Sequence, residues 1–286
     1  MMSTAAGGPA GGGISATNVA ILGIVGGLAG IYLSTILNGI TETTYFSFFG
    51  GIGAILAGVW GADAVRRVCS YGLGTGVPSI GMVALGMGIV AAIFGLALCY
   101  VLGISEVLGP IIAIVVAAII GFIMGTMANK ILNMNIPIME RCMVEIAVAG
   151  CLVMIALCVT ISGTLVFENS ILNTDITILS SVIQTGFIAL IFIGGAMIIL
   201  HPFNACLGPD ESQDRTLYVG VEKGGIIMAI TGVASLVVID VIPAMLTIVI
   251  GLLIWIIYFK KFINLTKRDA YKVIGTGLLP TEEELQ

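Results

Sequence analysis

Charge is what this sequence has least of. Asp, Glu, Lys and Arg make up 9% of its 286 residues, whereas hydrophobic residues make up 58%. Soluble domains carry roughly 25% charged residues, so a chain this poor in charge cannot cover a water-facing surface with polar groups. Glycine is abundant, with 39 residues, as is typical of closely packed membrane helices. The composition excludes an ordinary soluble domain, gives no basis for nucleic-acid binding and predicts a polytopic helical membrane protein.

Signals for secretion and for disulfide bonding are also missing. Residues 1–16 have neither the basic start nor the apolar middle of a secretory signal, and we expect a flexible N-terminal arm there. The six cysteines form no CxxC pair, so no disulfide framework is expected. Histidine is nearly absent, because His201 is the only one. A zinc site needs three or four ligands, and His201 with Cys206 supplies too few within this chain.

Long apolar runs take up most of the chain. A membrane-spanning helix needs about 20 mostly apolar residues, and the runs predict an all-α bundle of about eight spans. Six or seven spans remain alternatives, because the seventh and eighth can also be one long kinked element. We expect a flexible arm at 1–16, a transmembrane domain at 17–262 and a cytoplasmic tail at 263–286. The predicted spans are 18–38, 44–63, 79–103, 107–128, 143–166, 176–200, 219–239 and 242–260.

The distribution of charge predicts the orientation. With eight spans, all 11 Lys and Arg residues fall on one side of the membrane, and the loops of the other side carry only acidic residues. The positive-inside rule assigns the basic side to the cytoplasm. Both termini and the loop after the sixth span are then cytoplasmic. We therefore expect a multi-pass protein of the cell membrane with its polar chemistry on the cytoplasmic face.

The loop after the second span joins two arginines to a glycine-rich turn. Free backbone N–H groups before a helix start form a natural anion site, and guanidinium groups suit phosphate, sulfonate or carboxylate. The alternative is a flexible loop whose arginines anchor at anionic lipid headgroups. The candidate anion-binding residues are Arg66, Arg67, Gly74, Thr75 and Gly76.

Two carboxylates lie at the ends of predicted spans. Asp63 closes the second span, and Glu145 lies about one turn inside the fifth. Arg141 precedes Glu145 by four residues, so the two can pair on one helix face. An ionisable group inside the membrane boundary is a functional candidate by default, and an interfacial ion pair is the alternative.

The segment HPFNACLGPDESQDRTL, residues 201–217, interrupts the apolar runs with a polar loop. Prolines near both ends favour a defined shape over disorder. We interpret it as a loop that meets a soluble partner or lines a cytoplasmic cavity. Its candidate residues are His201, Asn204, Cys206, Asp210 and Arg215.

Three stretches carry a resemblance to a known family. WGADAVRRVCSYGLGTGVPSIG, NIPIMERC and the 201–217 loop resemble the C subunit of the tetrahydromethanopterin S-methyltransferase complex of methanogenic archaea. That complex moves a methyl group from methyl-tetrahydromethanopterin to coenzyme M and couples the transfer to sodium export. The resemblance implies an integral membrane subunit that works with the D and E subunits and with the corrinoid-carrying A subunit. It implies no corrinoid and no established catalytic residue in this chain.

The resemblance also suggests a chemistry for the candidate sites. Coenzyme M carries a thiol and a sulfonate, and the sulfonate suits Arg66, Arg67 and the adjoining glycine-rich turn. Asp63 and Glu145 become candidate sodium ligands, because hard cations prefer oxygen. Thiol activation often uses zinc, which keeps His201 and Cys206 open as ligands if partners supply the rest. A membrane scaffold for partner subunits and lipids, and a secondary transporter for a small anion, remain alternative functions.

Overall fold

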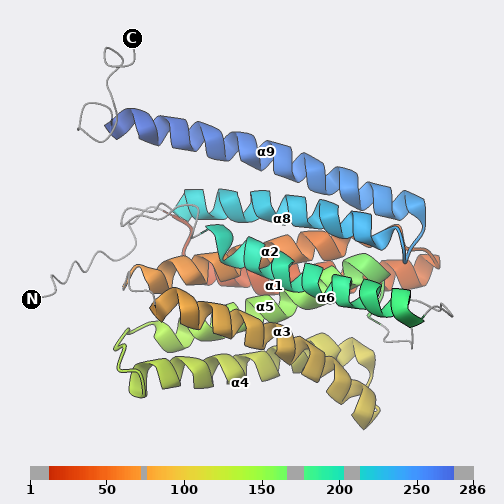
Figure 1. Cartoon of the computed structure of the whole chain (residues 1–286), viewed down its shortest axis with the longest axis horizontal. Helices are drawn as coiled ribbons and strands as arrows, with labels where there is room; N and C mark the ends of the chain where they lie inside the picture. Colours follow the sequence, from red (N-terminus) through yellow and green to blue (C-terminus); the bar gives the residue numbers. More distant parts are fainter. Residues whose placement is uncertain (1–12, 72–75, 166–176, 203–212, 274–286) are drawn as a thin grey trace, which may run out of the picture.

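The structure is a computed structural model that describes residues 13–71, 76–165, 177–202 and 213–273. Within these ranges every regular element is helical, as the sequence predicts, and the helices run side by side in a bundle (Figure 1). The helices are α1 (Ala16–Thr41), α2 (Phe48–Cys69), α3 (Gly76–Leu102), the short 3₁₀ turn η1 (Glu106–Leu108), α4 (Gly109–Lys130), α5 (Met139–Ser162), α6 (Thr177–Ile199), α8 (Gln213–Ser235) and α9 (Val241–Val273).

Seven of these helices are long and apolar enough to cross a membrane, and α6 adds a shorter apolar segment at Gly186–Ile199 in the part of the chain that the structure describes. The chain is therefore a multi-pass membrane protein. Each of the eight predicted spans coincides with one helix. The alternative of a single kinked element at the C-terminal end is wrong, because α8 and α9 are separate helices that lie side by side (Figure 1).

Helix ends are set by local backbone chemistry. Ser15 caps α1, because its hydroxyl accepts a hydrogen bond from the backbone N–H of Asn18 at 3.2 Å. Helix α5 ends at Gly163, whose φ of +76° favours glycine. The most C-terminal helix, α9, continues to Val273 and so takes in part of the predicted tail 263–286. Only the part of a helix inside lipid needs apolar residues, so α9 can continue through the polar residues that follow its apolar run.

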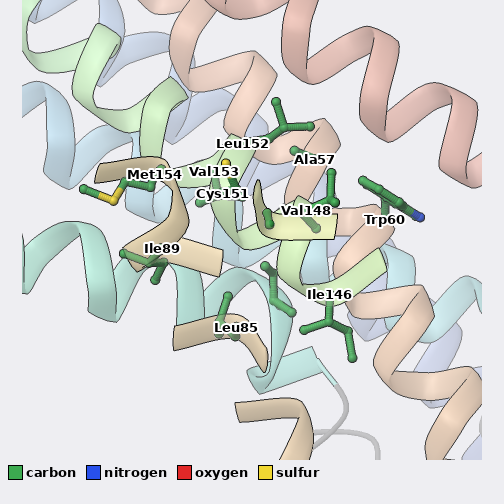
Figure 2. Packing of buried hydrophobic residues seen from close by; sticks show 14 of the residues in the cluster. Ala57, Trp60, Leu85, Ile89, Ile146, Val148, Cys151, Leu152, Val153 and Met154 are labelled. Carbon is green, nitrogen blue, oxygen red and sulfur yellow. The ribbon is translucent and has the colours of Figure 1, made fainter. Parts of the chain in front are cut away.

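Helices α2 and α5 form the centre of the bundle, and most of their residues are buried. Side chains from α2, α3 and α5 meet in the main apolar core (Figure 2). Trp60 of α2, Leu85 of α3 and Leu152 of α5 are representative, with 3%, 1% and 0% of their surface exposed. Because α2 and α5 are covered on all sides, any polar side chain they carry has to find its partners inside the protein.

Glycine lets the backbones around α5 approach closely. A Cβ at Gly88 of α3 would come within 2.1 Å of the carbonyl oxygen of Ala147, and one at Gly125 of α4 within 2.5 Å of the Cα of Glu140. No other residue fits at such contacts without moving a helix. Small residues at helix interfaces are the usual way in which membrane helices pack.

The outer helices α1, α4 and α9 expose many large apolar side chains, as expected of surfaces that face lipid or other subunits. In Figure 1, α9 lies at one edge of the bundle over α8, and α4 lies at the opposite edge beside α3.

Long-range contacts show which helix ends lie together. The side-chain amide of Gln213, at the start of α8, donates to the backbone oxygen of Ile14 and to Asp63. The start of α1, the end of α2 and the start of α8 are therefore neighbours at one end of the bundle. At the other end, Asn38 of α1 donates to the carbonyl of Gly163 after α5 at 2.8 Å. The assignment of the first end to the cytoplasm stays a prediction from the charge pattern.

Candidate functional site

The last two turns of α2 carry one acidic and two basic residues on the same helix face. Asp63, Arg66 and Arg67 are spaced i, i+3 and i+4, so their side chains can meet. Arg66 donates to Oδ1 of Asp63 from Nε at 3.3 Å and from Nη2 at 3.0 Å. Arg67 donates from Nε to Oδ2 at 2.8 Å. Both arginines are 7% exposed, and Asp63 is fully buried.

Arg67 also reaches across to α5. Its Nη2 donates to Oε2 of Glu145, and its Nη1 lies 3.6 Å from the sulfur of Cys142. Oε2 of Glu145 accepts a second hydrogen bond, at 2.8 Å, from the indole N–H of Trp60. Oε1 accepts from Nε of Arg141 at 2.8 Å. One guanidinium therefore holds a carboxylate of α2 and a carboxylate of α5 together in the interior.

We call Asp63, Arg66, Arg67, Arg141 and Glu145 the α2–α5 network. It contains three arginines and two carboxylates, so its formal charge is 3 − 2 = +1. All four carboxylate oxygens accept at least one hydrogen bond. The positive charge in excess is accessible mainly at Arg141, whose side chain is 57% exposed, whereas the other four are nearly enclosed. A buried network with a net positive charge at its mouth attracts anions.

The structure brings together candidates that sequence reasoning placed in separate roles. Arg66 and Arg67 were predicted to bind an anion, and Asp63 and Glu145 to bind sodium, and the four form one network. The predicted pairing of Arg141 with Glu145 is confirmed. The alternative in which Arg66 and Arg67 anchor at lipid headgroups disagrees with their burial inside the protein.

The glycine-rich turn and the polar loop are only partly described. Gly76 is the first residue of α3, and Gly74 and Thr75 lie outside the described residues. Asn204, Cys206 and Asp210 also lie outside them. Arg215 lies in the first turn of α8 and is partly buried.

Metal-binding geometry is not found among the described residues. No group of three or more His, Cys, Asp or Glu side chains gathers there as a metal site. The five described cysteines are free thiols. His201 therefore has no metal ligands beside it in the described ranges, and those ranges do not include Cys206.

A second buried charge lies in α8 and α9, and sequence reasoning did not choose it as a candidate. Glu222 of α8 is 4% exposed and accepts a 2.9 Å hydrogen bond at Oε1 from the indole N–H of Trp255. The ammonium of Lys223 lies 3.1 Å from Oε1 and 2.9 Å from Oε2. We call Glu222, Lys223 and Trp255 the α8–α9 cluster. The clue in the sequence was an adjacent acidic and basic pair inside the edge of a predicted span.

His201, just after α6, lies within the electrostatic reach of this cluster. Burial lowers the pKa of His201, and the positive charge of Lys223 lowers it further. The negative charge of Glu222 acts in the opposite direction. The net shift of the pKa is downward, so the imidazole is neutral at neutral pH. A neutral imidazole can both accept and donate a hydrogen bond at the end of the bundle where the 201–217 loop begins.

Comparison with known proteins gives the family. The MtrC family model, which describes the C subunit of tetrahydromethanopterin S-methyltransferase, matches residues 1–283. Relatives named as this C subunit are 56% identical in Methanosarcina mazei and 54% identical in Methanosarcina barkeri, each over 286 residues and the full length of both chains. The relative of the same name from Methanothermobacter thermautotrophicus is 43% identical over 284 residues, 99% of this chain and 100% of the relative. This chain therefore belongs to the MtrC family and is a membrane subunit of the tetrahydromethanopterin S-methyltransferase complex.

Proposed function

We propose that this subunit contributes to the sodium path of the complex and to a cytoplasmic cavity in which coenzyme M is methylated. Its partners in the cell membrane are the D and E subunits, and the A subunit carries the corrinoid, so no methyl-transfer step is assigned to a residue of this chain. The observation that carries the proposal is the α2–α5 network. It combines arginines and carboxylates, the groups that suit an anion and a cation, at the predicted cytoplasmic end of the bundle.

The positive charge in excess supports the coenzyme M half of the proposal. A sulfonate is a permanent anion that guanidinium groups bind well. Arg66 and Arg67 are balanced by Asp63 and Glu145, so exposed Arg141 carries the charge in excess and supplies donors at the mouth. Gly76, the first residue of α3, would complete the anion site with its backbone N–H group, and the sequence adds Gly74 and Thr75 as candidates.

The carboxylates support the sodium half, with one condition. Every oxygen of Asp63 and Glu145 already accepts a hydrogen bond, so sodium can bind only when a guanidinium turns away. An incoming sulfonate would draw a guanidinium toward itself and free a carboxylate oxygen. The anion and the cation would then bind more tightly together than separately, which is a coupling between transfer and ion movement.

The test uses the whole complex in sodium-loaded proteoliposomes. Arg141→Gln should raise the coenzyme M concentration for half-maximal methyl transfer, because it removes the accessible donor and the surplus charge. Lys130→Gln is the matched control, since Lys130 is exposed at the same end of the bundle and in the last turn of α4. An equal coenzyme M requirement in both variants and in the unmodified complex would rule out the anion site.

A second measurement tests the coupling. Saturating coenzyme M should lower the sodium concentration for half-maximal activity, and Glu145→Gln should remove this effect. If the variants change the yield of assembled complex and leave both requirements unchanged, the protein is a scaffold. Solute uptake by the purified chain alone would favour the anion transporter instead.

A further inference from the structure

Glu222 is buried within α8, a helix long and apolar enough to span a membrane. It is nine residues from the start of α8 and 13 from its end, which corresponds to roughly 14 Å and 20 Å along the axis. Its side chain is 5% exposed. An ionised carboxylate in such a place is costly unless it is paired, and it is a functional candidate by default. The proposed roles of the α2–α5 network make no use of it.

The pairing of Glu222 is unusual because its partner is the next residue. Consecutive helix residues do not face each other, so the stem of Lys223 has to bend back over the helix surface. Its ammonium then sits between the two carboxylate oxygens, at 3.1 Å and 2.9 Å. The side chain of Lys223 remains 22% exposed, and its stem is flexible. The contacts of this cation are at its tip, with the two oxygens of Glu222.

The two buried clusters differ in how firmly the carboxylate is held. Glu145 accepts from two guanidinium groups and an indole, and its partners come from two helices. The only ion pair that the described residues give Glu222 is the one with Lys223. Trp255 adds a hydrogen bond and no charge. Among the described residues, the charge of Glu222 is therefore balanced by a single ammonium.

We propose that Glu222 is a binding site for a monovalent metal cation and that the ammonium of Lys223 occupies this site when the metal ion is absent. The ammonium has the charge of such an ion and lies against both oxygens, as a bound ion would. When the metal ion replaces the ammonium, or the ammonium replaces the metal ion, the negative charge of Glu222 stays balanced. Trp255 holds the carboxylate in place against α9 during the exchange.

This site deepens the proposed sodium function and relies on it for the choice of sodium as the main probe. It would be a second cation-binding site in the bundle, connected to the α2–α5 network by α8. The start of that helix contacts Asp63 through Gln213, and Glu222 follows nine residues later. Ion paths with several moderate sites allow an ion both to enter and to leave.

The test measures cation binding by the intact, detergent-solubilised complex as the rise of its thermal transition with sodium, lithium or potassium chloride at constant ionic strength. Lys223→Met removes the internal competitor, so the sodium concentration for half-maximal stabilisation should fall about tenfold or more. Lys223→Arg keeps the charge and should stay near the unmodified complex. The double variant Glu222→Gln/Lys223→Met removes both charges, so it should fold without a cation and lose the response.

The outcomes separate the site from the proposed function. An unchanged sodium requirement in Lys223→Met would overturn the cation site, even if sodium transport by the unmodified complex is normal. If Lys223→Met fails to assemble in any salt while the double variant assembles and responds to sodium like the unmodified complex, the site is also overturned. Tighter cation binding in Lys223→Met would support the site, even if the unmodified complex proves unable to transport sodium.

Discussion

The indole N–H of Trp60 donates a 2.8 Å hydrogen bond to Glu145, and so connects α2 with α5 next to the bridging guanidinium of Arg67. Trp255 makes the same kind of bond to Glu222, between α9 and α8. The chain has two tryptophans, and each one donates to a buried glutamate on a neighbouring helix. Both are therefore part of the electrostatics of the bundle as well as of its packing.

Replacing Trp60 by Phe should lower the stability of the protein, because it removes a hydrogen bond to a charged group and part of a buried ring. Such hydrogen bonds contribute about 1.5–3 kcal/mol. Trp255→Phe removes the equivalent bond at a partly exposed position and should cost less. The loss of intact complex with temperature, followed by size-exclusion chromatography, measures the difference. Equal midpoints for Trp60→Phe and the unmodified complex would contradict the bond.

Arg67→Ala should be more damaging than Arg66→Ala. Arg67 contacts both Asp63 and Glu145, whereas Arg66 contacts Asp63, which keeps other donors without it. Breaking a buried pair by removing one partner costs about 3–5 kcal/mol.

The same thermal assay checks this prediction, and a double variant makes it specific. Glu145→Gln should cost less in the Arg67→Ala background than in the unmodified protein, since it removes a carboxylate that has lost its partner. Additive losses would show that Arg67 and Glu145 act independently.

Gly88→Ala should force α3 away from α5. The new methyl group would lie 2.1 Å from the carbonyl oxygen of Ala147, so about 1–3 kcal/mol of stability should be lost. Gly39 is the matched control, because no atom lies within 4 Å of the Cβ that alanine would add there. Gly39→Ala should leave stability unchanged or raise it by up to about 1 kcal/mol, as alanine favours helix. Assembly yields and thermal midpoints of the two variants check the contrast.

His201 should titrate below its ordinary pKa of 6.5, which NMR of the selectively histidine-labelled protein can measure. Lys223→Gln should raise this pKa, because a repelling charge is lost, and Glu222→Gln should lower it. A pKa of 6.5 in all three forms would contradict the placement of His201 beside the cluster.

The same shift has a consequence for stability. The unfolded chain binds a proton on His201 more readily than the folded chain does, so stability is full above about pH 6.5 and falls as the pH is lowered through the folded-state pKa. His201→Gln should flatten this part of the pH profile, while the pH dependence that other groups cause should remain.

The eight helices could be predicted from the sequence, because lipid demands long apolar runs and leaves few alternatives. The ends were harder to place. Helix α8 starts at Gln213, six residues before the predicted 219, because Asp214 and Arg215 resemble a loop in composition and are compatible with a helix start. Hydropathy detects where lipid ends, and backbone hydrogen bonding decides where a helix ends.

In the candidate site, contacts within one helix could be predicted from the sequence, whereas contacts between helices could not. Arg141 and Glu145 are four residues apart, so helical periodicity alone predicts their contact. Arg67 and Glu145 are 78 residues apart, and their contact depends on α2 packing against α5. Glu222 and Trp255 are 33 residues apart, and their contact likewise depends on α8 packing against α9.

The 33 residues of α9 form a helix about 50 Å long, whereas the hydrocarbon core of a bilayer is about 30 Å thick. In Figure 1 its end reaches past the adjacent end of α8. A continuous helix of this length therefore carries its last turns, with Lys267 and Arg268, beyond the hydrocarbon core. The hydrogen bond from Trp255 to Glu222 attaches the same helix to α8. One rigid element thus joins a buried carboxylate to a basic segment in the aqueous phase.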